Sequence, residues 1–279
     1  MKNLRRAITL TCLSLTSLLS SAQTDSVRVM RFVYDFTKLF AKSTNYDDRM
    51  NLDVLDDGSS AFYSVYSENP EELKDIGNKS REEVRELFSR VKIGSPDKYY
   101  RDMSKGELTF TTTQPTDFYY KEQIAEPAWT IAEGDTATHC GYTCQKATTT
   151  YAGRTWTVWF AEDIPVNAGP WKLSGLPGLI MDAYDTDSLF RFTCVGMEQA
   201  TVAPWTPDTK GKTKCTSEEY QKQWRLFDAD PTNYILRLHG LPPVTSDQVT
   251  RYENGVKVES NAPRNDIHFY LERLPNDKM

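Results

Sequence analysis

The chain has 279 residues, 12% of them aromatic, and carries 33 Lys and Arg against 39 Asp and Glu. The resulting formal net charge of −6 excludes the strongly basic surface that nucleic-acid binding requires. The length suffices for one large or two small domains with a substantial core.

The first 22 residues read as a secretory signal peptide. Lys2, Arg5 and Arg6 form a positive start, the run 7–19 is moderately apolar, and Ala22 is a small residue before a cut. The apolar run is shorter than the ~20 residues that a membrane span needs. We therefore expect an exported protein that is not membrane-spanning, in the periplasm, associated with the outer membrane, or secreted.

Residues 23–279 are expected to form one domain. Alternating apolar residues predict a strand at 30–36, and "MNLDVLDDGSSAFYS" predicts a hairpin around its Asp-Gly step. Ser80 with Glu83, and Thr216 with Glu219, have the spacing of capping boxes, each before an apolar stripe at helical period. They predict two amphipathic helices, the second closed by Asp230-Pro231. The Pro-rich, polar stretch from about 241 predicts a less ordered tail, apart from the apolar run 267–271.

Between the two helices the sequence is typical of β-structure. Short strand-like runs cover 106–113, 117–125 and 128–133, and two hairpins are expected around Ala152-Gly153 and around 185–188. In the first hairpin, Trp156, Val158 and Phe160 share one face of the strand. Because the strands follow one another without intervening helices, the sheet should be antiparallel. The fold class is therefore α+β, mostly β.

The stretch "GPWKLSGLPGLIMDAYDTD" concentrates glycine and proline among large apolar residues. Pro177 and Gly178 suit the second and third positions of a type II turn, and Gly175 allows a close backbone approach. No Gly-x-Ser-x-Gly nucleophile elbow is present. We interpret the segment as a rigid corner that feeds a buried strand, formed by Gly169, Pro170, Gly175, Leu176, Pro177, Gly178, Leu179 and Ile180.

Residues 140–183 resemble the core signature of the GLPGLI family of exported proteins from Gram-negative bacteria. The matching steps, in order, are Gly141-Tyr142, Lys146-Ala147, Gly153-Arg154, Trp159-Phe160, Ile164-Pro165, Gly169-Pro170-Trp171 and Gly175 to Ile180. The run "NDIHFYLE" departs from the Asn-Pro-hydrophobic-Glu step expected near the end. The resemblance implies an exported compartment and no established activity. By analogy, a curved antiparallel sheet like the half barrel of lipoprotein carriers would suit it.

Four cysteines lie outside the signal peptide and allow two disulfides in three connectivities: Cys140, Cys144, Cys194 and Cys215. If Cys140 and Cys144 share a strand, they lie about 13 Å apart. A disulfide needs Cα atoms within about 7 Å, so each would then pair elsewhere. His139 beside Cys140 has no partner at metal-ligand spacing, so no metal and no cofactor is expected.

The hairpin around Ala152-Gly153 is rich in aromatic residues, and we call it the aromatic hairpin. This hairpin and the rigid corner supply the expected binding residues, which are Tyr142, Lys146, Arg154, Trp156, Trp159 and Trp171. We expect a non-enzymatic protein that binds a lipid or other apolar ligand, a peptide strand or an outer-membrane partner. No catalytic residue is expected. One alternative is a hydrolase that uses Lys172 and Ser174, or the acidic turn of Asp182, Asp185 and Asp187. Another is a structural envelope component, which predicts no cavity.

Overall fold

A computed structural model of the chain describes residues 26–41, 44–67, 78–244, 251–253 and 256–258. The expected signal peptide lies outside these residues, as does most of the expected tail beyond 244. Within the described tail, β13 (Arg251–Glu253) and β14 (Val256–Val258) form a small separate hairpin. No helix in the described ranges is long and apolar enough to span a membrane.

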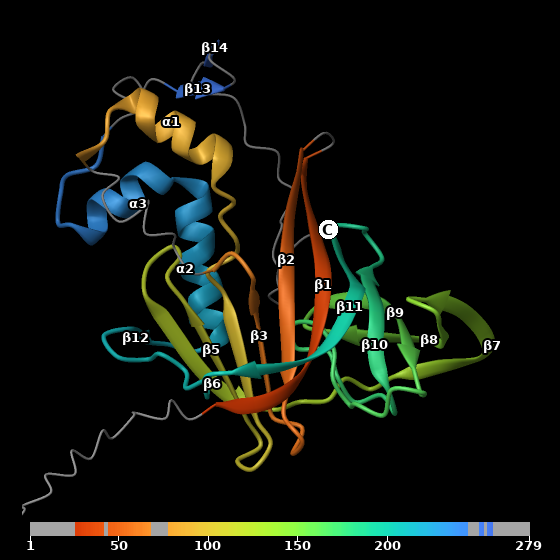
Figure 1. Ribbon diagram of the computed structural model, residues 1–279. Coiled ribbons are helices and arrows are strands. Elements are labelled where there is room, and N and C mark those ends of the chain that lie inside the picture. The colour runs from red at the N-terminus through yellow and green to blue at the C-terminus, as the bar shows by residue number, and fades with distance from the viewer. Residues whose placement is uncertain (1–25, 42–43, 68–77, 245–250, 254–255, 259–279) are drawn as a thin grey trace, which may run out of the picture.

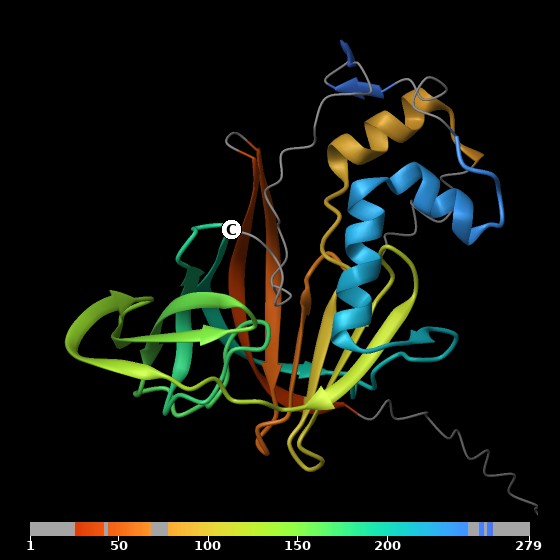
Figure 2. The same ribbon diagram turned by 180° about the vertical axis from the view of Figure 1, so that it is seen from behind.

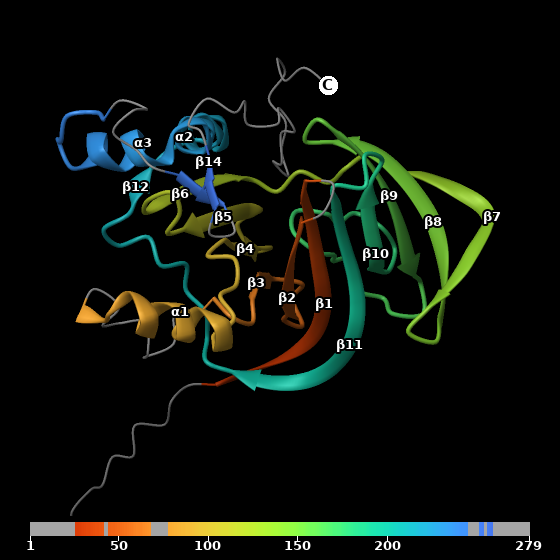
Figure 3. The ribbon, with the colours of Figure 1, turned by 90° about the horizontal axis from the view of Figure 1, so that it is seen from above.

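One curved sheet of twelve strands dominates the molecule (Figure 1). Its spatial order is β12-β6-β5-β4-β3-β2-β1-β11-β10-β9-β8-β7, and every pairing is antiparallel except that of β12 with β6. Seen from above, the sheet forms an arc from β6 through β1 to β7 (Figure 3). The strands are β1 (Val27–Ala41), β2 (Thr44–Val54), β3 (Ser60–Ser64), β4 (Lys98–Asp102), β5 (Glu107–Thr112), β6 (Phe118–Gln123), β7 (Thr130–His139), β8 (Tyr142–Tyr151), β9 (Arg154–Ala161), β10 (Leu179–Asp185), β11 (Phe190–Val202) and β12 (Thr213–Lys214).

The architecture confirms the expected mostly-β class and the curved antiparallel sheet. The hairpin turns form where the sequence places them, with positive φ at Gly58 and at Ala152 and Gly153. On β9, Trp156, Val158 and Phe160 are buried on one face, as the period of two predicts. Figure 2 shows β7 and β8 at one end of the sheet and the helices at the other.

Both capping boxes form and begin helices at the expected residues. α1 (Arg81–Arg90) begins after Ser80 and α2 (Ser217–Ala229) after Thr216, and each cap side chain accepts from the N3 backbone N–H. A third helix, α3 (Pro231–Leu238), is not expected from the sequence. Asp230-Pro231 ends α2 but also begins α3, because the Asp230 carboxylate accepts from Asn233 N–H and proline is favoured in a first helical turn.

The segment 162–178 connects β9 to β10 and packs into the core, and we call it the inner loop. Ala168, Trp171, Leu173 and Leu176 are all buried. The expected type II turn is wrong, because Gly178 does not have positive φ and Leu179 N–H bonds to Ile164 O. Glycine is required there for space, since a Cβ on Gly178 would lie 2.1 Å from the Ala161 carbonyl oxygen.

Candidate functional site

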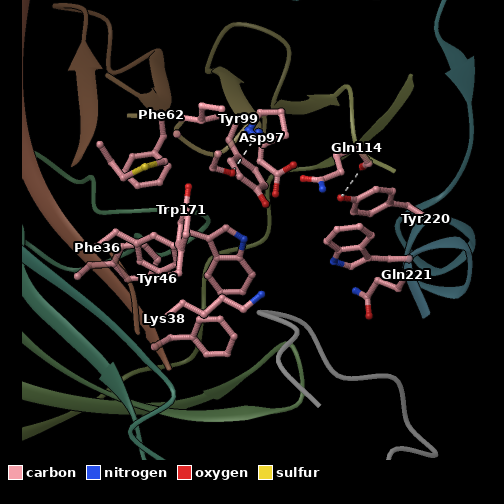
Figure 4. Close-up of a pocket in the computed structure, with 18 of the residues that line it drawn as sticks. Phe36, Lys38, Tyr46, Phe62, Asp97, Tyr99, Gln114, Trp171, Tyr220 and Gln221 are labelled. Carbon is pink, nitrogen blue, oxygen red and sulfur yellow. Dashed lines mark hydrogen bonds between the residues drawn. The ribbon is translucent and has the colours of Figure 1, made fainter. Parts of the chain in front are cut away.

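The main cavity of the described residues has a volume of about 540 Å³ and lies between the sheet and α2 (Figure 4). This is within the range of small-molecule sites. Half of its twenty lining residues are aromatic. They are Phe36, Tyr46, Phe62, Tyr99, Tyr120, Trp171, Phe190, Phe192, Tyr220 and Trp224.

The sheet wall of the cavity follows from strand alternation. Phe36 on β1 and Phe192 on β11 are register partners, and their rings stack with centroids 4.6 Å apart. Phe62 on β3 meets Phe192 edge-on at 6.0 Å. Side chains on the same face of neighbouring strands thus give a continuous aromatic surface.

The opposite wall comes from α2. Tyr220 is buried against Phe110 of β5, with ring centroids 4.9 Å apart, which fixes the helix on the sheet. One turn later, Trp224 stacks on Phe227 at 5.2 Å and reaches the cavity. In Figure 4 the indole of Trp171 stands on the opposite side of the cavity from Tyr220 and Gln221 of α2.

The inner loop supplies Trp171, which is 2% exposed and has φ of 58°. Its indole packs on Trp156 at 5.6 Å and on Tyr151 at 5.8 Å. Trp156 therefore lies behind the residue that lines the cavity. A bulky residue with positive φ is uncommon and indicates that the surroundings hold it firmly.

Polar contacts fasten the inner loop to the far wall of the sheet. Lys172 Nζ lies 2.7 Å from Glu122 Oε1, and its backbone carbonyl accepts from Arg101 at 3.2 Å. The Arg101 guanidinium also donates to Ser174 Oγ, and Trp129 Nε1 donates to the Ser174 carbonyl at 2.7 Å. The loop is therefore a fixed part of the cavity floor.

The cavity also has ionisable groups in its wall: Lys38, Asp97 and Asp228. Burial lowers the pKa of Lys38 to about 8, with the Asp97 charge opposing this. Burial raises the pKa of Asp97 to about 6, against a hydrogen bond from Thr112. Both shifts have the direction that partial burial gives, and both residues keep some exposure to solvent.

One side of the cavity, the segment 93–97, is held by Asp48. This buried carboxylate accepts from Ser95 N at 2.7 Å, Ser64 Oγ at 2.8 Å and Tyr46 Oη at 3.0 Å. No sequence pattern singles out Asp48, because its partners come from three separate segments of the chain.

The structure separates the binding residues expected from sequence. Trp171 lines the main cavity, and Trp156 and Arg154 support residues that do, since the Arg154 guanidinium lies 4.6 Å from the centroid of the Phe190 ring. Tyr142, Lys146 and Trp159 lie on β8 and β9 outside it. Trp159 packs on His139 at 5.9 Å, and Lys146 is 3.5 Å from Asp135.

The groups of the hydrolase alternative are held in separate contacts. Arg154 lies 2.7 Å from Asp185 with both side chains buried, and Arg191 and Thr193 bond Asp182. Neither these carboxylates nor Lys172, Ser174 or Asp187 line the main cavity. Within the described ranges, no three His, Cys, Asp or Glu side chains are placed to hold a metal ion.

The four cysteines are free thiols in the structure, so neither disulfide that their number allows is present. Cys140 and Cys144 do not share a strand, because Cys140-Gly141 forms the turn between β7 and β8 with positive φ at both residues. Cys140 Sγ lies 2.9 Å from the Cys194 carbonyl oxygen, whereas Cys215 follows β12 at the opposite end of the sheet.

Comparisons with known proteins find only partial or weak similarity to this chain. A family model described as a protein of unknown function (Porph_ging) matches residues 150–182, much less than half of the chain. The matched segment contains the turn and strand of the aromatic hairpin and the whole inner loop. Comparison with curated protein sequences gives no match.

Several solved structures are weakly similar. PNGF-II in a P21 crystal form has 12% identity and a TM-score of 0.47, and the likeness covers 70% of this chain and 33% of that one. The C2 crystal form of PNGF-II has 13% identity and a TM-score of 0.46, and the likeness covers 70% of this chain and 32% of that one. A LolA superfamily protein from Nitrosomonas europaea gives 5% identity, a TM-score of 0.25, and coverage of 66% and 90%. The chain thus spans about a third of the length of the PNGF-II chains.

Proposed function

We propose that the protein is a non-enzymatic binding protein that holds an apolar ligand in the aromatic cavity between the sheet and α2. The observation that carries this proposal is the cavity itself, about 540 Å³ with ten aromatic side chains in its wall. Apolar area removed from water supplies about 25 cal/mol per Å², so such a wall favours apolar ligands strongly. A structural component without a ligand predicts no cavity, and so the cavity favours binding.

The supporting contacts suit a preformed site. The floor is fixed by the inner loop through Lys172 and Ser174, and the side by Asp48. A wall that is already ordered loses little conformational entropy when a ligand binds. The reactive side chains of the hydrolase alternative take part in these fixing contacts or lie elsewhere, which supports binding over catalysis.

We also propose that the chain belongs with the GLPGLI-like exported proteins. Seven ordered steps between residues 141 and 180 support this, as does the overlapping match at 150–182. The export proposal predicts that the mature protein begins at Gln23, which N-terminal sequencing of the protein from a periplasmic extract would test. A retained leader in the purified protein would contradict it.

The binding test uses a fluorescent apolar probe and a blocked cavity. Ile93 lines the cavity and is 41% exposed, so Ile93→Trp should fill the space without disturbing the core. Ile131 on the edge strand β7 is also 41% exposed and is not part of the lining, which makes Ile131→Trp the matched control. We expect a neutral fluorescent naphthalene probe to bind the wild type and Ile131→Trp equally.

Ile93→Trp should weaken probe binding at least tenfold, and native mass spectrometry of the wild type should show co-purified small molecules. Equal binding by both variants would place the probe outside the cavity and contradict the proposed site. Absence of any saturable binding to the wild type would overturn the proposed function.

A further inference from the structure

The wall of the cavity selects for rings rather than flexible chains. Against ten aromatic residues it has two large aliphatic side chains, Met50 and Ile93. Offset and edge-to-face contacts between rings add about 0.5–1.5 kcal/mol beyond the area they bury. An acyl chain gains the area term alone, whereas a ring compound also gains these contacts on several sides.

One polar atom in this wall lacks a partner. Trp171 Nε1 is fully buried and has no hydrogen-bond acceptor among the described residues. Figure 4 shows the indole of Trp171 with its nitrogen turned toward the middle of the cavity. A buried donor left without an acceptor costs about 1–3 kcal/mol, so an acceptor delivered by a ligand gains more than one that replaces water.

A neighbouring tryptophan provides the contrast. Trp156 Nε1 is also buried without an acceptor in the described part of the chain, but Trp156 lies behind Trp171 and does not line the cavity. Of these two buried indole N–H groups, that of Trp171 alone belongs to a residue that lines the cavity.

The wall of the cavity carries charges of both signs, so a charged ligand of either sign would meet a like charge in it. Asp97 and Asp228 contribute two carboxylates and Lys38 one ammonium group. An anionic ligand would face the two carboxylates, and a cationic one the ammonium group and the Arg154 guanidinium behind Phe190. A neutral compound avoids burying a further charge, which is costly without a full set of partners.

We propose that the cavity takes a neutral aromatic compound of fused or linked rings, with a carbonyl or ether oxygen that accepts a hydrogen bond from Trp171 Nε1. This inference rests on the proposed function and names its ligand class. The rings lie between Trp171 of the inner loop and Trp224 of α2, and the oxygen sets their orientation.

The test compares two probes of nearly the same shape, 2-acetylnaphthalene, which has a carbonyl acceptor, and 2-ethylnaphthalene, which has none. Dissociation constants are measured for the wild type, Trp171→Phe and Trp156→Phe. Trp171→Phe keeps a ring and removes the donor. We expect the preference for the acetyl probe over the ethyl probe to fall about 5- to 10-fold in Trp171→Phe, which is the loss of one hydrogen bond of about 1 kcal/mol or slightly more. The preference should be unchanged in Trp156→Phe.

Comparing this preference between variants cancels the different solubilities of the probes. A second measurement needs no variant of Trp171. In the ¹⁵N-labelled wild type, 2-acetylnaphthalene should move one indole N–H proton resonance downfield, and 2-ethylnaphthalene should not. That resonance should persist in Trp156→Phe.

The outcomes separate the two proposals. If both probes bind competitively but the preference is the same in all variants and no indole proton moves downfield, the acceptor inference is overturned and the apolar-binding function stands. The acceptor inference also fails if an ordered water keeps the indole N–H in the complex. If neither probe binds the wild type, both proposals fail.

Discussion

The inner loop and the cavity beside it are both built from large apolar residues, but the inner loop is packed and the cavity is hollow. Leu173 in the inner loop and Trp156 behind it are fully buried and do not line the cavity. Phe36, Phe62 and Phe192 are also largely buried, but they present their rings to a cavity of about 540 Å³. Rings alone therefore produce neither a solid core nor a binding site.

The difference lies in what covers each part of the sheet. The inner loop brings its own apolar side chains and is fastened to its surroundings by Lys172, 2.7 Å from Glu122, and by the Ser174 carbonyl, which accepts from Trp129 Nε1 at 2.7 Å. The helix α2 is anchored by Tyr220 near its start, and Trp224, one turn later, faces the cavity. The covering element decides whether an aromatic surface is packed or hollow.

Loss of the buried charge pair behind the cavity should have the largest effect. Arg154 and Asp185 are each 1% exposed, and Arg154→Met leaves a buried carboxylate without its cation. We expect the free energy of unfolding to fall by about 3–5 kcal/mol in urea denaturation. The exposed pair Lys105–Asp102 is the control, because solvent screens its charges and Lys105→Met should leave the free energy of unfolding nearly unchanged. Equal effects of the two substitutions would contradict this.

Matched truncations compare the packed and the hollow region directly. Leu173 in the inner loop is 0% exposed, and Leu173→Ala should lower the free energy of unfolding by about 2–5 kcal/mol through lost burial and a new void. Trp224 is half-buried and already faces a cavity, so Trp224→Ala should cost less, about 1–2 kcal/mol, although it removes more atoms. A greater loss for Trp224→Ala would show that α2 packs as tightly as the loop.

Two glycines sharpen the comparison from the opposite direction, by adding volume. In Gly178→Ala the new Cβ would meet the Ala161 carbonyl at 2.1 Å, so we expect a loss of about 3 kcal/mol from the forced backbone shift. Gly196 on β11 has nothing within 4 Å of an added Cβ, and Gly196→Ala should stay within about 0.5 kcal/mol of the wild type. Thermal unfolding of both variants at one pH gives the comparison.

Much of this fold can be predicted from local rules. The capping boxes at Ser80 and Thr216 and the Ala152-Gly153 turn involve residues a few positions apart, so the sequence alone determines them. The sequence identifies the inner loop as a fixed segment, but the type II turn rule predicts positive φ for Gly178, which the structure does not have. Gly178 is required by the nearby Ala161 carbonyl, a contact that a turn rule does not contain.

The cavity can be predicted least. Its walls come from β1, β3, β11, the inner loop and α2, which are distant in sequence and meet only through the sheet order. The expected binding residues follow from aromatic density in one hairpin, and of these Trp171 alone lines the cavity. Aromatic density marks the packed region. The hollow region depends on where Trp224 of α2 lies. The helical period of Tyr220, Trp224 and Phe227 indicates only that these residues share one buried face.

The smallest effect we predict concerns pH and the polar wall of the cavity. Burial raises the pKa of Asp97 to about 6, above the ~3.9 of an unfolded chain. Between about pH 4 and 6 the unfolded state loses the proton while the folded state keeps it, so the Asp97 contribution lowers stability as pH rises through this window and is constant above it. Asp97→Asn removes this contribution, and the melting temperature of the variant should therefore rise relative to wild type from pH 4 to pH 6.5.

The neighbouring charge does not obscure this pH effect. Lys38, the cation facing Asp97, stays charged throughout the range because its own pKa is about 8. Glu86→Gln, which changes an exposed carboxylate outside the cavity wall, is the control substitution. If the melting temperatures of Asp97→Asn and wild type change in parallel with pH, the cavity wall is as well hydrated as the surface, and the inner loop and the cavity then differ in packing alone.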